Sequence, residues 1–502
     1  MKCKISMLVL CLGLFFVFIS CSGKDDGVTV TTNAQNDIES ELIEETVTSN
    51  MFVDDSLPDD LDFEGADVNI LTREDIPFIY EMGVEGANGE VVNDAIYERN
   101  RNVEERLNVK INVYTRPTGG ESEITRAVMA GDDLYSIFAG YAAYIIEPVL
   151  SRSFYNLHDM RYLDFDKPWW INNLNEAMTV YDMLFFTAGD ITLSMIQYEG
   201  CIFYNQNLYE QHGISDDIYE LVTQGKWTID KLAELSKYIS GDLNGDGVFD
   251  KNDLYGFSQA DSVLIFAMGR AAGLKVMEKD STGFPQIVMD NPQTYTIIDK
   301  INNLFTNESS YVVLYKKDEP GNTEQQNVQL TQKMFANDQV LFYTGHIIDM
   351  EGLRDMESDY GIVPMPKFDE SQANYVTNAR DSYSMIAVPV TCSNLDMTGA
   401  VLEAMASESY RTVTPTYFNI ALKDKYSRDE KTADMINIIH ESVAHDFGIS
   451  VIGYLSYISH TFQHCIENTT NEFGSLYATR ITAAETGLAK LKTAYEELKG
   501  VN

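Results

Sequence analysis

Basic residues are scarce in this 502-residue chain. It has 36 lysines and arginines against 77 aspartates and glutamates, which gives a formal net charge of −41 at pH 7. A chain with so few cations has nothing to neutralise a phosphate backbone, so a general nucleic-acid-binding role is excluded. The same charge argues against adhesion to anionic lipids. Any membrane attachment therefore has to come from covalently bound acyl chains.

Cysteine is also rare. Of the six cysteines, Cys3 and Cys11 lie in an apolar N-terminal segment. The spacing of Cys201, Cys392 and Cys465 matches no zinc-ligand pattern, and a body of this size needs no disulfide framework. At most one bridge can form among these three, and we expect them to be buried free thiols.

Long apolar runs are missing after the first twenty residues. Residues 5–19 are almost entirely apolar, follow two lysines, and are too short to span a bilayer. The run ends in Val17-Phe-Ile-Ser-Cys21, and a small residue directly before a cysteine resembles the cleavage box of bacterial lipoproteins. This resemblance implies that residues 1–20 are a lipoprotein signal peptide and that lipid is attached to Cys21. An ordinary signal peptide is the alternative.

The segment after Cys21 is acidic. Residues 21–64 contain few aromatics and almost no lysine or arginine. Like charges repel each other and little apolar surface is available for a core. We therefore expect residues 21–64 to be a disordered tether between the anchor and a folded body.

One acidic loop has the spacing of a calcium site. Oxygen-bearing side chains stand at positions 1, 3, 5, 9 and 12 of residues 242–253, Gly247 stands at position 6, and the Val248 carbonyl at position 7. The side chains are Asp242, Asn244, Asp246, Asp250 and Asp253. No second loop follows, so we expect one structural Ca²⁺ that stiffens a long connection. A solvated acidic turn is the alternative, because aspartate at position 12 has a shorter reach than glutamate.

The start of the body predicts an α/β fold. A strand at residues 67–72, a helix from Asn93 to about residue 107 and a strand at 109–114 form a parallel crossover unit. A further strand at 134–139 ends just before Tyr141. Because ligands bind at the carboxyl ends of strands in such sheets, we expect Tyr141 in a binding crevice. A partly buried edge tyrosine is the alternative.

Aromatic residues are plentiful, with 29 tyrosines and 24 phenylalanines, and they suit stacking on an uncharged ligand. Adjacent Trp169 and Trp170 suit a sugar platform, and a core position is the alternative for at least one of them. Asp190 follows an apolar segment, and we expect it to hydrogen-bond a ligand.

Several short segments, in their order, resemble the extracellular solute-binding proteins of family 1, the substrate-capturing subunits of ABC importers. The first are Tyr204-Asn205, residues 208–214, Gly225-Lys-Trp-Thr228 at a helix start, and Tyr255-Gly-Phe257. Residues 335–345, 359–366 and 384–389 continue the series. Each piece alone is weak, but the order is specific.

The resemblance implies a two-lobed periplasmic-binding-protein-like fold of type II. Each lobe would be a mostly parallel sheet flanked by helices. The N-terminal lobe would comprise residues 65–185 plus 368–410, and the C-terminal lobe residues 186–367 plus 411–502. The chain would cross a hinge near residues 186, 367 and 410, and the lobes would close on a ligand.

The resemblance also implies ligand contacts at Tyr198, at His346 after a strand end, and at Arg380 and Asp381 before a returning strand. Arg380 would clamp a carboxylate or a sugar hydroxyl, or would pair with one of the chain's many acids.

These observations together predict a monomeric solute-binding protein, lipid-anchored at the outer face of the cell membrane. It would capture a small solute, which we expect to be a carbohydrate, and deliver it to the membrane subunits of an ABC permease. No nucleophile elbow or phosphate loop occurs, and we expect no enzyme. The alternatives are a secreted glycoside hydrolase, with two carboxylates across a cleft, and a ligand-binding partner of a sensor.

Overall fold

The computed structural model describes residues 53–75, 78–117, 120–314, 323–424 and 430–499. Val53–Asn502 form one compact unit. The expected signal peptide, Cys21 and the expected tether up to residue 52 lie outside the described residues. For residues 53–64 the expectation of a disordered tether is wrong, because Leu57 is buried and Asp55 accepts two hydrogen bonds from Arg106 at 2.7 Å. Within the described part, no helix is both long and apolar enough to cross a membrane.

Four strands form the first sheet, in the order β12-β3-β1-β2. The strands are β1 (Ala66–Arg73), β2 (Val109–Arg116), β3 (Ile137–Tyr141) and β12 (Ser384–Ala387). β1 pairs in parallel with β2 and β3, and β12 pairs antiparallel with β3. This sheet is mostly parallel, as expected.

The predicted crossover is confirmed. Helix α3 (Val91–Leu107) connects β1 to β2 and buries Ile96, Val103 and Leu107 on one face. The cap differs from the expectation: the side chain of Glu90 accepts a hydrogen bond from the backbone N–H of Asn93, so the helix begins earlier than residue 93. An N-cap carboxylate satisfies one of the free amides of the first turn.

The second sheet has the strand order β11-β4-β10-β6-β5, with β9 paired to β6 outside this path. The strands are β4 (Gly200–Asn205), β5 (Ser240–Gly241), β6 (Leu254–Gln259), β9 (Ser310–Val312), β10 (Val340–His346) and β11 (Tyr360–Pro364). β10 is parallel to β6 but antiparallel to β4, and β11 is antiparallel to β4.

The expectation of a mostly parallel second sheet is therefore wrong, because this sheet is mixed. β4 brings the chain into the second sheet from the first, whereas β10 and β11 run back.

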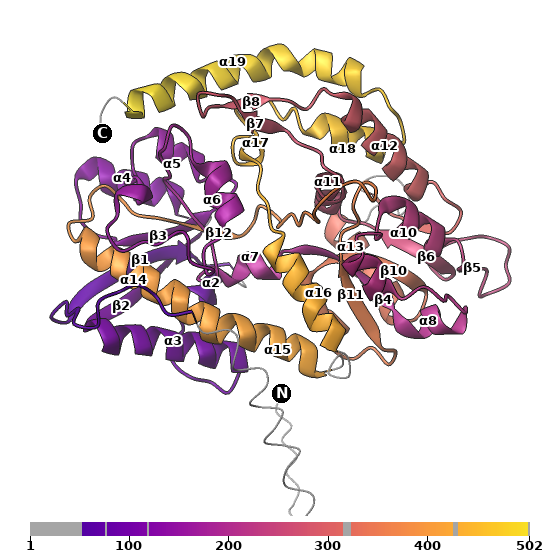
Figure 1. Ribbon diagram of the computed structural model, residues 1–502, viewed down its shortest axis with the longest axis horizontal. Coiled ribbons are helices and arrows are strands. Elements are labelled where there is room, and N and C mark those ends of the chain that lie inside the picture. Colours follow the sequence, from indigo (N-terminus) through magenta and orange to yellow (C-terminus); the bar gives the residue numbers. More distant parts are fainter. Residues whose placement is uncertain (1–52, 76–77, 118–119, 315–322, 425–429, 500–502) are drawn as a thin grey trace, which may run out of the picture. The chain divides into compact units, whose positions relative to one another are not determined.

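Helices cover both sheets (Figure 1). Those around the first sheet are α2 (Phe78–Glu81), α4 (Glu121–Ala130), α5 (Ile146–Leu150), α6 (Asn172–Met178) and α14 (Leu395–Glu408). Those around the second are α8 (Gln206–Gln211), α9 (Ile218–Thr223), α10 (Ile229–Ser236), α11 (Ser262–Ala271), α12 (Pro292–Phe305) and α13 (Glu324–Ala336). A hairpin of β7 (Met277–Lys279) and β8 (Pro285–Ile287) stands apart. The three described cysteines are buried and free, as predicted.

The chain passes between the sheets along adjacent segments. Thr187 pairs with Ile386, Glu199 with Ala379, and Thr377 with Val443, each through an isolated bridge. Helix α7 (Leu193–Gln197) precedes β4 in this region. The stretch from Tyr198 is therefore extended only from Gly200 onward.

The chain passes from the first sheet to the second once more after residue 410. That residue lies in a π-helical turn, Ser409–Val413, between α14 and α15 (Thr414–Asp424), and both helices contact α3 of the first sheet. The next helix, α16 (Glu430–Glu441), packs on β11 of the second sheet. The lobe boundaries themselves stay a prediction.

The C-terminal helix ties distant segments together. α19 (Phe473–Lys499) runs along the top of Figure 1 in yellow and contacts α18 (His460–Glu467). Its Tyr495 ring packs against Phe185 and against Phe447 of α17 (Phe447–Ser450). At Gly487 the helix touches residues 451–459 backbone to backbone, because a Cβ there would lie 1.7 Å from the Tyr454 carbonyl oxygen.

We predict that Gly487→Ala destabilises the protein, although alanine favours helices. The added methyl group has to displace backbone, and such overpacking costs about 1–3 kcal/mol. Gly453→Ala is the matched control, since a Cβ at Gly453 meets no atom within 4 Å. Urea unfolding of both variants measures the effect. Equal stability of Gly487→Ala and the parent chain would contradict the contact.

Candidate functional site

Polar and aromatic side chains gather where strands of both sheets end. Arg73 is the last residue of β1 and Tyr141 the last of β3. His346 is the last residue of β10, and Asp261 follows β6 as the N-cap of α11. Ligand crevices of α/β sheets lie at such carboxyl ends.

Arg73 is held between two aromatic rings. Its guanidinium carbon lies 3.8 Å from the centroid of the Phe78 ring and 4.3 Å from that of Tyr141. The guanidinium also donates to the Asp75 carboxylate and to the Ser382 carbonyl. This buried cation therefore joins β1, α2, β3 and the segment before β12. Sequence reasoning missed Arg73, although a cation directly after an apolar strand is a signal in a chain so poor in arginine.

An aromatic line continues from Phe78 toward the second sheet. The Phe78 and Tyr198 rings stack with centroids 5.9 Å apart and an interplanar angle of 15°. Tyr198 in turn meets His346 edge to face at 5.7 Å. Burial raises the pKa of the half-buried Tyr198 hydroxyl and lowers the pKa of the buried His346 imidazole. Both side chains are therefore neutral hydrogen-bonding groups at neutral pH.

Arg380 and Asp381 lie beside this line. The Arg380 backbone N–H donates to the Tyr198 carbonyl at 3.0 Å, and its guanidinium donates to Asp261 at 3.2 Å. Of the two roles weighed for Arg380, the structure therefore shows the ion pair with an acid. Burial raises the pKa of the neighbouring Asp381 carboxyl, although the Arg380 charge works in the opposite direction.

A cavity of about 570 Å³ opens next to these residues. Ligand pockets commonly have volumes of about 300–1,000 Å³. One wall is built from the end of β3 and the start of α5, and the other from the turns between α17 and α18. The cavity is lined by Tyr141, Ala143, Tyr144, Ile146, Glu147, Asp381, Ser450, Val451, Ile452, Gly453, Tyr454, Tyr457 and His460.

The structure thus brings five of the eight expected ligand residues into one neighbourhood. They are Tyr141, Tyr198, His346, Arg380 and Asp381. Sequence reasoning missed Phe78, Tyr144, Tyr454 and Tyr457. No sequence signal ties the tyrosines at 454 and 457 to a strand end more than 300 residues earlier.

The two tryptophans occupy the core instead. Trp169 is fully buried and Trp170 is 2% exposed. Their indole N–H groups donate to the two oxygens of Glu403, at 3.1 and 2.9 Å. Burial raises the pKa of Glu403 to about 7. The expectation of a sugar platform is corrected, because both rings face a buried carboxylate and not a ligand.

Asp190 is also fully buried, away from the cavity. It accepts a hydrogen bond from the Thr414 hydroxyl at 2.5 Å and interacts with His440. His440 Nδ1 lies 2.7 Å from Glu199, which is buried beside Tyr198. Asp190 therefore belongs to a buried polar cluster between the sheets, and the expectation that it contacts ligand is corrected.

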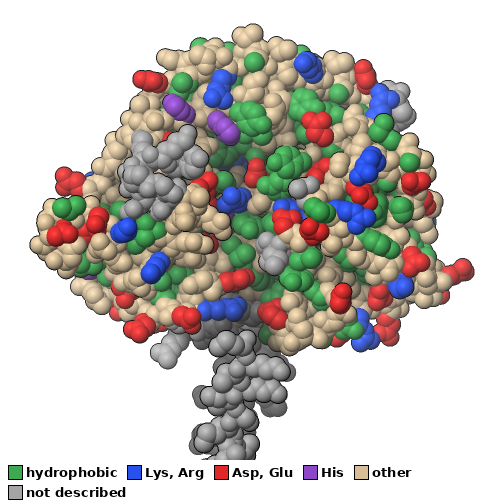
Figure 2. Space-filling model, turned by 180° about the vertical axis from the view of Figure 1, so that it is seen from behind, with side chains coloured by type: hydrophobic (Ala, Val, Ile, Leu, Met, Phe, Trp, Pro, Cys, Tyr) green, Lys and Arg blue, Asp and Glu red, His purple; other side chains and the backbone are tan. Residues whose placement is uncertain are grey.

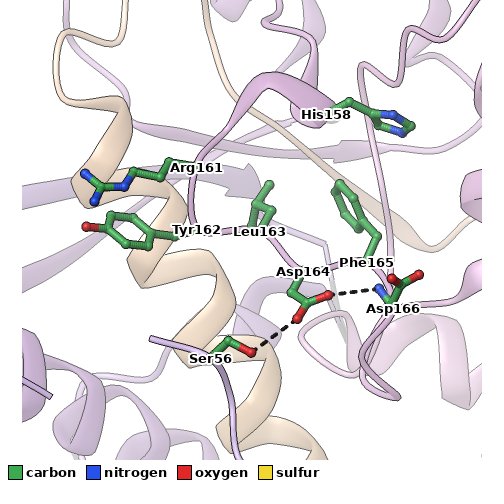
Figure 3. A pocket seen from close by; sticks show the side chains of 8 residues that line it. All are labelled: Ser56, His158, Arg161, Tyr162, Leu163, Asp164, Phe165 and Asp166. Atoms are coloured by element: carbon green, nitrogen blue, oxygen red, sulfur yellow. Dashed lines mark hydrogen bonds between the residues drawn. The ribbon is translucent and has the colours of Figure 1, made fainter. Parts of the chain in front are cut away.

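A second hollow of about 490 Å³ lies elsewhere on the first sheet's side, and its lining is drawn in Figure 3. Ser56 and the backbone of Asp166 both donate to Asp164, each at 3.3 Å. Arg161 and Tyr162 extend to one side while His158 stands apart (Figure 3). Its polar groups do not converge, so this hollow is the weaker candidate.

The acidic loop shows part of the expected calcium geometry. Gly247 has a positive φ of +77°, as the sharp turn at position 6 requires, and Asp253 is fully buried. Asp242 accepts the backbone N–H groups of Gly245 and Gly247. Across the described ranges, however, no three histidine, cysteine or acidic side chains are grouped closely enough to hold a metal ion. Calcium binding stays a prediction.

Solved structures share this architecture. A cyclo/maltodextrin-binding protein in complex with maltotetraose aligns with a TM-score of 0.55 and 11% identity, covering 84% of this chain and 96% of that one. The two-lobed fold of the solute-binding proteins is thereby established. The apo form of RafE from Streptococcus pneumoniae aligns with a TM-score of 0.53 and 15% identity over 84% of this chain and 98% of its own. An ABC substrate-binding protein from Listeria monocytogenes in complex with cycloalternan aligns with a TM-score of 0.50 and 13% identity. The alignment covers 84% of this chain and 99% of that one.

No family model matches the chain, and no curated protein matches it. At such low identities, the solved structures establish the fold alone.

Acidic side chains are spread over the face in Figure 2, and hydrophobic side chains gather around a hollow near its middle.

We predict that His440 makes stability depend on pH. Burial alone would lower its pKa, but the adjacent Glu199 and Asp190 carboxylates raise it to about 9, against 6.5 for a free histidine. The protonated His440 therefore contributes its full stabilisation below about pH 6.5 and loses it as the pH rises through about 9. The free energy of unfolding should fall by about 1–3 kcal/mol over this range.

Urea unfolding across this pH range measures the loss. His440→Gln should flatten the profile, whereas His464→Gln, at an exposed position, should keep it. A parent profile identical to that of His440→Gln would contradict the assignment.

Proposed function

We propose that this protein is a solute-binding protein that captures a carbohydrate between its two sheets without altering it. The observation that carries the proposal is the aromatic line from Tyr141 across Arg73 and Phe78 to Tyr198, which leads from the first sheet to the second. The solved structures with bound maltotetraose and cycloalternan have the same fold.

The chemistry of the cavity favours a sugar. Tyr141, Tyr144, Tyr454 and Tyr457 offer ring faces for the C–H-rich faces of a pyranose, and their hydroxyls can donate and accept hydrogen bonds. Tyr144 and Tyr457 are 58% and 50% exposed, so their rings are open to a ligand. Apolar residues between them supply the remaining contact area.

An enzymatic role is less well supported. Ser450 lines the cavity and its hydroxyl lies 3.0 Å from His445 Nε2, which is the first half of a nucleophile–base pair. The other imidazole nitrogen, however, faces the Tyr383 hydroxyl and not a carboxylate. Burial lowers the pKa of His445 to about 3, so it is a poor base at neutral pH.

Delivery to an ABC importer and lipid anchoring through Cys21 belong to the same proposal. They are supported by the lipoprotein-like segment and by the order of segments that resembles family 1. The protein would then sit at the outer face of the cell membrane. Closure of the two lobes would present the loaded form to the permease.

We predict that a neutral or amino-containing oligosaccharide raises the melting temperature, because a ligand that binds only the folded state stabilises it. Calorimetry against a glycan panel gives the affinity, and chromatography of the recovered sugar tests for turnover. Stoichiometric binding with intact sugar supports capture, whereas released products would overturn it.

Tyr144→Ala should weaken the binding of that sugar about tenfold. Tyr238→Ala is the matched control, since Tyr238 is 57% exposed but outside the cavity. Equal affinities of the two variants would place the ligand elsewhere.

We also predict that Ca²⁺ raises the melting temperature of chelator-treated protein. At a Ca²⁺ concentration a hundredfold above Kd, the free energy of unfolding should rise by about 2.7 kcal/mol. Asp246→Asn should abolish the response, and Asp132→Asn, at another exposed turn, should retain it. A melting temperature that Ca²⁺ leaves unchanged would show that the loop is only a solvated acidic turn.

A further inference from the structure

The cavity carries an excess of negative charge. Asp381 and Glu147 line it, and its lining, which lies wholly within the described ranges, contains no lysine or arginine. Two arginines lie close enough to Tyr141 for their charges to affect its hydroxyl, but each forms an ion pair with another residue. Arg73 pairs with Asp75, and Arg380 pairs with Asp261. Arg380 also acts on Asp381, but it forms its ion pair with Asp261, so the two arginines face four carboxylates: Asp75, Asp261, Asp381 and Glu147.

The remaining titratable group of the lining does not supply the missing charge. Burial lowers the pKa of His460, and the nearby Arg480 lowers it further. Its imidazole is therefore neutral at neutral pH. Burial and then the charge of Glu147 raise the pKa of the Tyr454 hydroxyl, so this carboxylate stands close to a ring of the opposite wall.

Tyrosine rings surround these carboxylates. The rings of Tyr141 and Tyr144 meet edge to face with centroids 4.9 Å apart on one wall, and Tyr454 and Tyr457 stand on the other. Aromatic faces attract cations, by about 0.5–2 kcal/mol each. Carboxylates among tyrosine rings form a site for an ammonium group on an otherwise sugar-like ligand.

We propose that the solute is a sugar that carries a protonated amine, an amino-sugar oligosaccharide bound with its ammonium group between Asp381, Glu147 and the four tyrosines. This inference rests on the proposed function and narrows its ligand class. The amine compensates the two carboxylates, and the pyranose faces stack on the rings. The strongly acidic chain adds a long-range attraction for such a solute.

Calorimetry with matched sugars tests this. The probes are β-1,4-linked glucosamine oligomers and α-1,4-linked galactosamine oligomers, each compared with its N-acetylated form and with the neutral hexose oligomer of equal length. At about pH 6, below the usual range of amine pKa values, the free amine form should bind about tenfold or more tightly than either counterpart. This preference should shrink as salt is added.

Substitutions of the two cavity carboxylates test whether they bind the ammonium group of the ligand. Asp381→Asn and Glu147→Gln should each reduce the preference for the amine form about fivefold or more, measured as the ratio of the affinities for the amine and the neutral oligomer in the same variant. Glu210→Gln, at an exposed position on α8, is the control and should retain the preference.

Three results would overturn the inference. Tighter binding of the neutral or N-acetylated oligomers would overturn it and leave the proposed function intact. A preference that survives both cavity variants would place the amine elsewhere. If no member of a broad glycan panel bound, both this inference and the proposed function would be wrong.

Discussion

The arrangement of the site depends on one buried cation. Arg73 ends the central strand of the first sheet, and its guanidinium lies between the Phe78 and Tyr141 rings. Removing a guanidinium from water is costly unless hydrogen bonds and charges compensate for the loss. Asp75, the Ser382 carbonyl and two ring faces do so here, and each comes from a different segment. The cation can therefore be buried only when these segments meet, which fixes Tyr141 in the lining of the cavity and the buried Phe78 against Tyr198.

From this point the architecture follows in steps. Phe78 stacks on Tyr198, which stands just before the strand that enters the second sheet. The Arg380 backbone N–H donates to the Tyr198 carbonyl, so two of the passages between the sheets are held together beside the cavity. A sugar that orders Tyr141 and Tyr198 would act on both sheets at once. That coupling is the physical basis of hinge closure in a two-lobed protein.

Local patterns were readable from the sequence, whereas long-range partners were not. The strand–helix–strand unit from residue 66 to residue 116 is local, and its prediction was confirmed. Of the five candidates that lie together, Tyr141 was predicted from the meaning of strand ends in α/β folds, and the other four from the resemblance in the order of segments. The sequence left open whether the tryptophan pair forms a sugar platform or lies in the core, because its partner, Glu403, is more than 230 residues away. The cavity wall at Tyr454 and Tyr457 was missed for the same reason: it is set by backbone contact with Gly487 on α19.

The most direct test of the account is the distance between the two lobes with and without a sugar. Spin labels at Met129→Cys on α4 and Tyr238→Cys after α10 report it, since both positions are exposed and the described native cysteines are buried. The account predicts that a saturating oligosaccharide narrows the distance distribution and shifts it to a single value. Identical distributions in the free and the sugar-bound protein would contradict binding between two lobes that close.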